Sequence, residues 1–461
     1  MKVMSWAAEE LKTASLGDKR RNKRLIKIVE DLSAMPHASV TQAARDEAAV
    51  QGTYEFWGNV RVKANDILAA HRDSTLSRVE EQQIVLAVQD TTELDFSSQP
   101  SKLGLGALSK KDAQGLKVHS VLCVSPKGVP LGVLHQKVWA REKNRRTTGY
   151  QDRKRAIEQK ESHRWLESLE LTQQWIPQDK RVVTVADREA DIYELFALPR
   201  REGSEFLIRA CQPRGVKQTE TDIDIESLQA AIAQTAACSD VKLELQRTPK
   251  RKARTATLTV RFASLYLQPP QQHPQRKDLK PVRVQVVWAM EEQPPSGEKA
   301  ISWLLVTTLE VRDYEQAERC LRWYSYRWLI ERYHYTLKSG CRLEQLQLET
   351  ADRLERALAT YAIVAWRLLW LTYEARCQPS ESIEGILPTH YWQVLYCHIH
   401  QTTVLPNEPP TLADCVRWIA RLGGFLGRRQ DGEPGVKTLW LGLQRLHDMA
   451  SIWQLIVANA S

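Results

Sequence analysis

The sequence lacks the patterns that mark several classes of protein. Its eight cysteines are scattered through 461 residues without a Cys-x-x-Cys pair, which indicates reduced thiols rather than a disulfide framework. Residues 1–12 contain no apolar run of the kind found in a secretory signal. The most hydrophobic segment, residues 357–373, contains Arg367 and has charged flanks, so we expect a buried helix there rather than a membrane span. These features favour a soluble, intracellular protein.

Acidic residues are outnumbered by basic ones. The formal net charge is +9, the isoelectric point is near 9.0 and 43% of the residues are hydrophobic, with 15 tryptophans. A chain of this length predicts about three domains, each able to bury a core without disulfides. The positive charge favours a polyanionic partner, although a membrane surface or a ribosome would also attract it.

The most informative segment runs from Tyr324 to Lys338. If it forms one α-helix, Tyr324, Arg327, Glu331 and Lys338 fall within an arc of roughly 60°. Such a stripe suits a metal ion and a phosphodiester: the carboxylate holds the metal, the two cations bind phosphate oxygens and the phenol donates a hydrogen bond. The alternative is a solvated helix with favourable pairing between Arg327 and Glu331.

Two apolar runs end in acids. The first, residues 84–89, leads into Asp90, and the second, residues 181–186, leads into Asp187. Both runs read as buried strands. A lone acid after a strand is usually a helix cap or a turn residue. Together with Glu331, however, these two acids predict three carboxylates in one pocket, as a pair of divalent cations requires.

The motifs around these acids resemble those of the DDE transposases of the IS4 family. The matching segments are Gln-Asp-Thr-Thr at residues 89–92, Asp-Arg-Glu-Ala-Asp at 187–191, the Tyr324 to Lys338 stripe and the glycine-rich tail at 419–435. The resemblance extends over nearly the whole chain. It implies an α/β fold: an RNase H-like catalytic core interrupted by a β-rich insertion, with helical N-terminal and C-terminal domains.

The expected domains follow from pattern and resemblance together. We expect a helical DNA-end-binding domain over 1–70, a catalytic core over 71–372 with its insertion at about 212–300, and a helical dimerisation domain over 373–461. From the sequence alone, the last helices would serve equally well as a lid over the core. The insertion also follows from length, because 144 positions separate Asp187 from Glu331, far more than a short connection needs. Strand-like alternation fills part of that interval, at 241–245, 256–262 and 282–286.

The N-terminal segment predicts a basic amphipathic helix. Apolar residues recur there at helical spacing, so one face packs and the other meets solvent. Either that face is simply solvated, or it binds DNA ends, and a phosphoryl-transfer site elsewhere in the chain favours DNA. The basic residues that we expect to contact DNA are Arg20, Arg21, Lys23, Arg24 and Lys27.

The resemblance implies further DNA contacts. Trp303 matches a family position that stacks on a flipped base, although a tryptophan in an apolar strand is usually a core residue. Arg209 matches a position that contacts phosphate near a DNA hairpin. Lys160 and Arg164 lie in a segment that resembles a DNA-contacting region. Tyr335 departs from the family pattern, since a basic residue is expected there, and a phosphate contact is lost or replaced by stacking.

The expected reaction follows from the donor atoms. Three carboxylates without cysteine or histidine favour Mg²⁺, two ions in all, with Mn²⁺ able to substitute. The resemblance implies cut-and-paste transposition: strand cleavage at terminal inverted repeats, hairpin formation and opening, and strand transfer into target DNA. It also implies double-stranded DNA as the partner, a homodimer in the synaptic complex, no membrane association, and a bacterial cytoplasmic, nucleoid-associated location. The alternatives are a metal-dependent nuclease that does not join ends and a non-catalytic DNA-binding relic or inhibitor.

Overall fold

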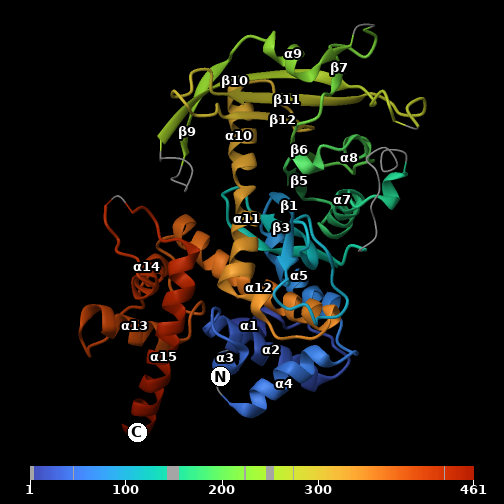
Figure 1. The fold of residues 1–461 in the computed structure, drawn as a ribbon. Coiled ribbons are helices and arrows are strands. Elements are labelled where there is room, and N and C mark those ends of the chain that lie inside the picture. The colour runs from blue at the N-terminus through green and yellow to red at the C-terminus, as the bar shows by residue number, and fades with distance from the viewer. Residues whose placement is uncertain are drawn as a thin grey trace. The chain divides into compact units, whose positions relative to one another are not determined.

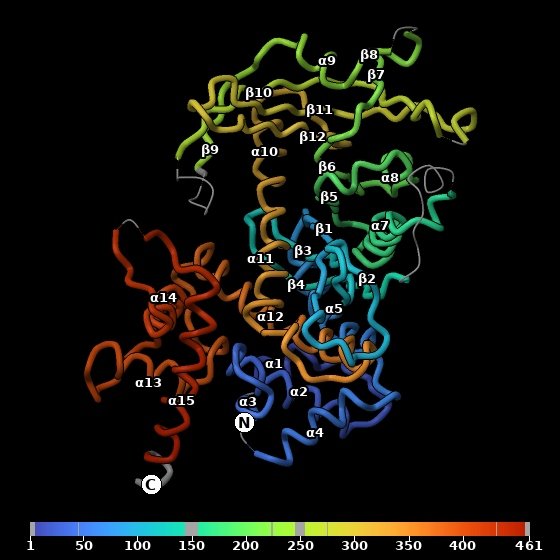
Figure 2. The backbone as a smooth tube through the Cα atoms, in the orientation of Figure 1, coloured from blue at the N-terminus to red at the C-terminus, as the bar shows by residue number. Residues whose placement is uncertain are grey.

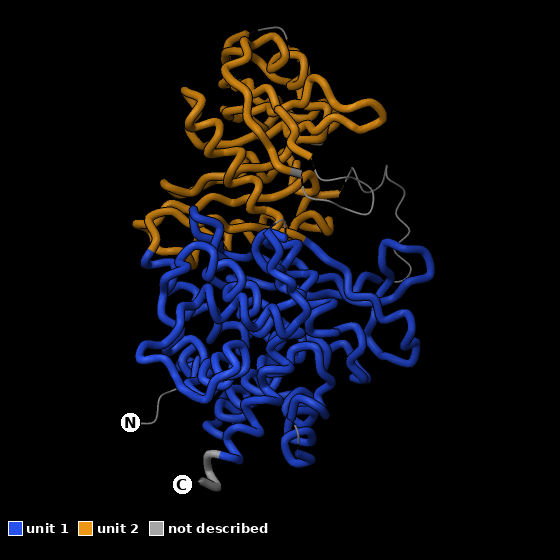
Figure 3. Tube along the Cα trace, turned by 90° about the vertical axis from the view of Figure 1, so that its left-hand side faces the viewer, with its two compact units in different colours: residues 1–81, 91–144, 329–461 blue, residues 82–90, 145–328 orange. Residues whose placement is uncertain are grey.

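The chain forms two compact units. Our computed structural model describes residues 5–44, 46–142, 155–222, 225–245, 254–273, 275–429 and 431–460. Unit 1 comprises residues 1–81, 91–144 and 329–461, and unit 2 comprises residues 82–90 and 145–328 (Figure 3). This division differs from the three domains expected above, whose boundaries stay a prediction.

Unit 1 begins with five helices. They are α1 (Trp6–Glu10), α2 (Lys19–Ala34), α3 (Val40–Ala44), α4 (Glu47–Gly58) and α5 (Ala64–Glu80). The α2 helix begins where the Asp18 carboxylate accepts a hydrogen bond from the Arg20 N–H at 2.8 Å. Its buried residues recur at helical spacing, and its basic residues lie on the other face. The predicted amphipathic helix is therefore confirmed.

Three strands and part of a fourth complete the sheet of unit 1. They are β2 (Gly106–Ala107), β3 (Gln114–Val124), β4 (Pro130–Trp139) and the end of β1 (Ile84–Asp95). The sequence predicts two strands, at residues 117–124 and 129–139, joined by a turn at 125–128. β3 and β4 pair antiparallel, and Gly128 closes their turn with a positive φ of 87°, so this hairpin is confirmed. The prediction that the first strand ends at Asp90 is wrong, because pairing with β3 carries β1 on to Asp95. That pairing is close enough that a Cβ on Gly115 would stand 1.8 Å from the Leu94 oxygen.

The long helix α12 (Ala351–Cys377) lies at the centre of unit 1. It packs against α2, α4, α5 and β4, and its Trp366 indole donates to the Pro130 oxygen at 2.9 Å. The C-terminal helices α13 (Thr389–His400), α14 (Leu412–Leu422) and α15 (Val436–Ala460) follow it. The sequence predicts a helix over residues 412–426 that ends in glycines, but α14 ends at Leu422 with Gly423 as its cap. A Cβ there would stand 1.8 Å from the Thr438 oxygen of α15, so this close approach requires glycine.

Unit 2 is built around three parallel strands. β5 (Arg181–Ala186) lies between the first part of β1 and β6 (Ser204–Arg209) and is parallel to both. β12 (Ser302–Thr307) pairs antiparallel with β6. Figure 1 shows α7 (His163–Trp175) and α8 (Tyr193–Ala197) on one side of β5 and β6 and α10 (Tyr314–Ser325) on the other. The sheet and the helices α7 and α8 bury a continuous apolar core between them that includes Phe196, Phe206 and Ile208.

The predicted β-rich insertion is present as a run of strands between β6 and β12. It contains β7 (Gly215–Lys217), β8 (Glu226–Ser227), the short helix α9 (Leu228–Ala233), β9 (Ser239–Leu245), β10 (Arg254–Leu267) and β11 (Val282–Met290). β10 pairs antiparallel with β7, β9 and β11, and β11 pairs with β12, so the insertion extends the sheet of unit 2 (Figure 2). The three alternating segments of the sequence fall in β9, β10 and β11. A mixed α/β fold with helical N-terminal and C-terminal regions is thus confirmed.

The described helices include none that combines the length and the apolar character needed to cross a membrane. Most of α12 is buried among other elements of unit 1. Its most hydrophobic segment therefore serves the core, as predicted.

A buried ionic network joins α1 to the rest of unit 1. Glu10, only 5% exposed, accepts hydrogen bonds from Arg78 at 2.8 and 2.9 Å and from His71 Nδ1 at 2.6 Å. His71 is neutral, because burial lowers its pKa and its Nε2 accepts the Val133 N–H at 2.9 Å. Burial alone would raise the pKa of Glu10, but the hydrogen bonds from His71 and Arg78 outweigh it and lower that pKa to about 2.

This network predicts that substitutions of the neighbouring acids Glu10 and Glu9 have very different effects on stability. Glu10→Gln should lower the free energy of unfolding by about 3–5 kcal/mol, because Arg78 then keeps a partly buried charge without its counter-ion. Glu9→Gln is the matched control: Glu9 is 55% exposed and pairs with Lys12 at 2.7 Å, so its loss should change stability by less than about 1 kcal/mol. Urea denaturation of the full chain measures both effects.

The same network predicts acid sensitivity. The folded pKa of Glu10, about 2, lies below its ordinary value of 4.5, so its stabilisation is complete above about pH 4.5 and is lost as the pH falls toward 2. Equal responses of the two variants to urea and to acid would contradict a role for Glu10.

Candidate active site

Parallel pairing of β1 and β5 brings two of the predicted acids together. The register matches Ala87 with Thr184 and Val88 with Val185, and two further residues along each strand lie Asp90 and Asp187. Since neighbouring strands are about 4.8 Å apart and opposed residues share a face, the two carboxylates lie close to each other. Both residues are partly exposed at the carboxyl end of β5, which is where α/β sheets bind ligands.

Asp187 also caps a short helix. Its Oδ1 accepts the Glu189 N–H at 2.9 Å, at the start of the 3₁₀ helix η2 (Arg188–Ala190). A helix cap and a metal-binding role are compatible in this residue. A carboxylate has about four lone-pair positions, and the hydrogen bond from Glu189 occupies one of them.

An aromatic and cationic group surrounds Asp187 within unit 2. Tyr324 is 4% exposed at the end of α10. Burial raises the pKa of its phenol most, and Asp187 raises it further, while Arg327 and Arg209 act in the opposite direction. The phenol therefore stays protonated and able to donate. The structure thus brings Asp187, Tyr324, Arg327 and Arg209 together.

Trp303 belongs to the same group. Its ring stands edge-on to that of Tyr324, with the ring centroids 5.4 Å apart. The Trp303 side chain is half-buried rather than enclosed in the core. It offers an aromatic surface beside Arg209, whose Nη2 donates to the Ser302 oxygen at 2.6 Å.

The remaining two residues of the predicted stripe lie in unit 1. Glu331 is on α11 (Trp328–Tyr335), and Lys338 is in a π-helical turn, η3 (Thr336–Gly340). The prediction of one continuous α-helix is wrong. α10 ends at Ser325, the Tyr326 and Arg327 N–H groups bond three residues back, and α11 begins at Trp328. The predicted arc of roughly 60° assumed a constant rotation of about 100° per residue, so it does not describe how these four side chains are arranged around the segment.

Contacts within unit 1 explain the orientation of α11. The Tyr333 hydroxyl lies 3.2 Å from Gln136 Nε2, and His334 Nε2 lies 3.2 Å from the Ser120 hydroxyl. These buried contacts hold α11 against β3 and β4, so Glu331 sits half-buried on a fixed helix. Lys338 donates to the Glu93 oxygen at 2.8 Å.

Whether a divalent metal fits this site depends on the donor atoms that the fold brings together. Among the described residues, no group of three or more His, Cys, Asp and Glu side chains is close enough to hold a metal. Asp90 and Asp187 form an adjacent pair of oxygen donors within unit 2, and Glu331 belongs to unit 1. Paired carboxylates are the donor set that hard divalent cations prefer, so the residues fit such an ion.

Lys160 and Arg164 lie next to each other in unit 2. Arg164 on α7 forms an ion pair with Glu189 at 2.7 Å and donates to the Glu161 oxygen at 2.8 Å. Lys160 is half-buried at the end of the 3₁₀ helix η1 (Ile157–Gln159). Arg164 thus ties α7 to the Asp187 segment. The polar, charged segment at residues 141–164, for which the sequence predicts a loop that leads into a helix, lies partly outside the described residues, at 143–154.

The basic residues of α2 divide into two groups. Arg20, Lys23 and Lys27 are exposed. Arg21 is half-buried and donates to the Leu16 oxygen at 2.8 Å. Arg24 packs so closely on α4 that a Cβ on Gly52 would stand 2.5 Å from its guanidinium carbon. Of the first group, Arg20 pairs with Asp18 and Lys27 with Asp31, and such exposed pairs can be exchanged for a ligand at little cost. The second group also holds the helices together.

Comparison with known families explains this arrangement. The family described as Transposase DNA-binding matches residues 3–62, and Transposase DDE domain matches residues 73–367. The chain belongs to the DDE transposases. The family described as Transposase Tn5 dimerisation domain matches residues 363–452. The three matches together are those of a Tn5-like transposase of the IS4 family, which confirms the resemblance.

Several predictions of function are confirmed by these matches. This transposase is an enzyme that acts on DNA in transposition, and its domains provide for DNA binding and for dimerisation. The DDE domain implies dependence on a divalent metal. The matched DNA-binding segment contains α2, and the matched DDE domain contains Asp90, Asp187 and Glu331. The roles of individual residues stay predictions.

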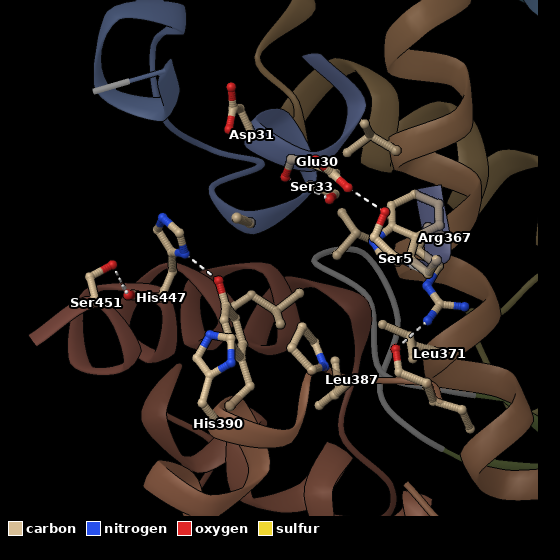
Figure 4. Close-up of a pocket in the computed structure, with 18 of the residues that line it drawn as sticks. Ser5, Glu30, Asp31, Ser33, Arg367, Leu371, Leu387, His390, His447 and Ser451 are labelled. Atoms are coloured by element: carbon tan, nitrogen blue, oxygen red, sulfur yellow. Dashed lines mark hydrogen bonds between the residues drawn. The ribbon is translucent and has the colours of Figure 1, made fainter. Parts of the chain in front are cut away.

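The transposase has a separate pocket in unit 1 that contains none of the predicted site residues. About 320 Å³ in volume, it lies among α1, α2, α12, α13 and α15 (Figure 4). Its buried Arg367 donates to the Ile386 oxygen at 2.7 Å and packs on Trp6 and Trp370. Burial lowers the pKa of Arg367 to about 10. These contacts tie the first helix to α12, so the pocket is a feature of packing.

Sequence reasoning missed the role of Asp191, the last residue of the Asp-Arg-Glu-Ala-Asp run. Its buried carboxylate accepts the N–H groups of Cys211 and Gln212 at 2.6 and 2.7 Å. It also accepts hydrogen bonds from Arg214 at 2.7 and 2.9 Å. Asp191 therefore fixes the loop that follows β6. The only signal in the sequence is its place in the motif, because its partners lie 20 to 23 residues away.

We predict that Asp191→Asn destabilises unit 2. Removing one partner of this buried ion pair leaves Arg214 with a charge that no acid neutralises. The free energy of unfolding should fall by about 3–5 kcal/mol. Thermal unfolding and proteolysis near residues 210–214 measure the change. Asp179→Asn is the control, because Asp179 is 70% exposed and pairs only with its neighbour Lys180 at 3.2 Å. Similar melting of both variants would show that the Asp191 network adds no stability.

Proposed function

We propose that this transposase moves its element by cut-and-paste. It would cleave strands at terminal inverted repeats, form and open a DNA hairpin, and transfer the freed strand into target DNA. The observation that carries the proposal is the parallel ladder of β1 and β5, which runs from Ile84–Arg181 to Val88–Val185 and brings Asp90 and Asp187 to the same end of the two strands. The Tyr324 phenol interacts electrostatically with Asp187, Arg327 and Arg209. Acids that hold metal and cations that hold phosphate are what phosphoryl transfer requires.

Asp90, Asp187 and Glu331 are the proposed metal ligands. Two Mg²⁺ ions, or Mn²⁺ in their place, would supply activation of water or of a 3′-hydroxyl and stabilisation of the leaving oxygen. The side chains perform the remaining tasks. Arg327 and Lys338 would bind phosphate oxygens around the scissile linkage, and the protonated Tyr324 phenol would donate to another.

The hairpin step would use the aromatic group beside Asp187. A sharply bent DNA end is relieved when one base leaves the stack, and Trp303 offers a half-buried ring to receive it. Support comes from its edge-on contact with Tyr324, which would keep the indole ring beside the reacting strand. Arg209 would hold a phosphate near the same bend.

Assembly would bring two copies onto two transposon ends. The exposed Arg20, Lys23 and Lys27 of α2 would bind backbone phosphates, together with Arg21 and Arg24 where DNA approaches. Lys160 and Arg164 would extend that contact. We further propose a homodimeric synaptic complex, domain boundaries near residues 70 and 372, and action at the bacterial nucleoid.

Cleavage followed by joining decides between this proposal and a nuclease without joining activity. We expect the full chain, given Mg²⁺ and a duplex with the inverted repeat from beside its coding region, to cut the 3′ end and join it to a plasmid. Gel analysis of labelled strands measures both steps, and pre-cleaved ends test joining separately. Cutting without any joining would favour the nuclease, and neither activity beside an active control transposase would defeat the proposal.

A second experiment distinguishes a chemical role of Asp187 from a structural one. We expect Asp187→Ala to bind end DNA with unchanged affinity but to lose cleavage by at least about a thousandfold, because a metal ligand and its charge are removed. Asp179→Ala serves as the matched exposed-acid control. Gel-shift and cleavage assays run on the same preparations distinguish the two effects. If Asp187→Ala loses DNA binding together with activity, the acid is structural, as it would be in a non-catalytic DNA-binding relic.

A further inference from the structure

Unit 2 contains a pocket of its own, which lies beside Asp187 and is distinct from the exposed part of the Trp303 ring. It is about 310 Å³ in volume, and its wall includes Arg188, Arg209, Arg214, Gln212 and Ser302. It opens where β5 and β6 end, next to the proposed metal ligand. Ligands of α/β sheets bind at this edge.

Strand geometry separates this pocket from the aromatic group. Ser302 and Leu304 of β12 line the pocket, and Trp303 between them points to the opposite face of the strand, where it meets Tyr324. A ligand in the pocket would therefore not be the base that stacks on Trp303.

The pocket is positively charged, and this charge is only partly neutralised by neighbouring groups. All of its lining side chains that carry a charge at neutral pH are arginines. Asp191 neutralises Arg214, and Arg209 donates to the Ser302 oxygen. Arg188 is exposed, and among the described residues its guanidinium has no hydrogen-bond or ion-pair partner. One guanidinium is thus free to bind an anion.

The wall around that guanidinium is rigid and polar. Asp191 holds the backbone of Cys211 and Gln212, which fixes the loop between β6 and β7. Ser227, Gln212 and Gln229 add neutral hydrogen-bonding groups. The volume is near the lower end of ligand sites, roughly 300 Å³, so it suits one phosphate with its sugar and excludes a duplex.

We propose that this pocket, through Arg188, binds a backbone phosphate of a DNA strand beside the catalytic carboxylates. Arg188 would supply the main contact, and Arg209 would face the same phosphate from the end of β6. The proposal rests on the proposed function and adds to it a second strand-binding point, on the other face of β12 from Trp303. The strand belongs to the transposon end, to its flanking DNA or to the target, which share this chemistry.

Charge removal at the two ends of β5 tests the proposal. Arg188→Ala removes the pocket charge just beyond the carboxyl end of β5, and Arg181→Ala removes an equal, exposed charge at its amino end. The full chain is titrated without divalent metal against three probes over a range of salt concentrations. The probes are an end duplex that stops at the cleavage position, the same duplex with flanking DNA, and the flush duplex with added target DNA.

We expect Arg188→Ala to weaken binding to at least one probe by about tenfold. The slope of log affinity against log salt should fall by about 0.9, as for one lost phosphate contact. Arg188→Lys should restore most of both effects, and Arg181→Ala should change neither. The probe that first shows the loss identifies the strand: end, flank or target.

Identical titrations of Arg188→Ala and Arg181→Ala with all three probes would overturn the inference. Circular dichroism of each variant confirms that the fold is unchanged before the comparison. Failure of the proposed function would look different, because it would appear as absence of Mg²⁺-dependent cleavage by the unsubstituted chain.

Discussion

Parallel pairing between β1 and β5 is the constraint on which the catalytic arrangement depends. The ladder ends with the pair Val88–Val185, and Asp90 and Asp187 each follow that pair by two residues. Like charges at one end of two neighbouring strands are unfavourable unless cations are present. The buried apolar core behind β5 anchors the strand that leads into Asp187.

The arginines near Asp187 balance that concentration of negative charge. Arg209 and Arg327 both act on the Tyr324 phenol beside Asp187, so the acid and the cations share one environment within unit 2. A guanidinium binds phosphate oxygens as readily as it offsets a carboxylate. Bound metal would offset the negative charge of the acids, and the same arginines would then be available to a phosphodiester, as the proposed function requires.

The sequence predicted most of the strands because each carries a strong local signal. The runs leading into Asp90 and Asp187 are β-branched and apolar, and residues 282–286 alternate as one face of β11 is buried. The interruption at Tyr326 and Arg327 was missed because no glycine or proline marks it. Its cause is tertiary: Tyr333 and His334 bond to β4 and β3, which sets the course of α11 independently of α10. The spacing of residues within one segment carries no information about a contact with distant strands.

The Asp-Arg-Glu-Ala-Asp run shows why residue type alone did not assign roles. Asp187 and Asp191 are four positions apart, yet their surroundings differ in kind. Asp191 is 4% exposed and accepts hydrogen bonds from Cys211, Gln212 and Arg214, which saturate its oxygens and leave it no capacity for a metal. Asp187 is partly exposed, and its Oδ1 accepts the Glu189 N–H of η2. The acid at the strand end thus keeps free lone pairs for the proposed chemistry, while the acid of the next turn serves the structure. Burial and the number of donors within reach, rather than the motif, decide which acid does which.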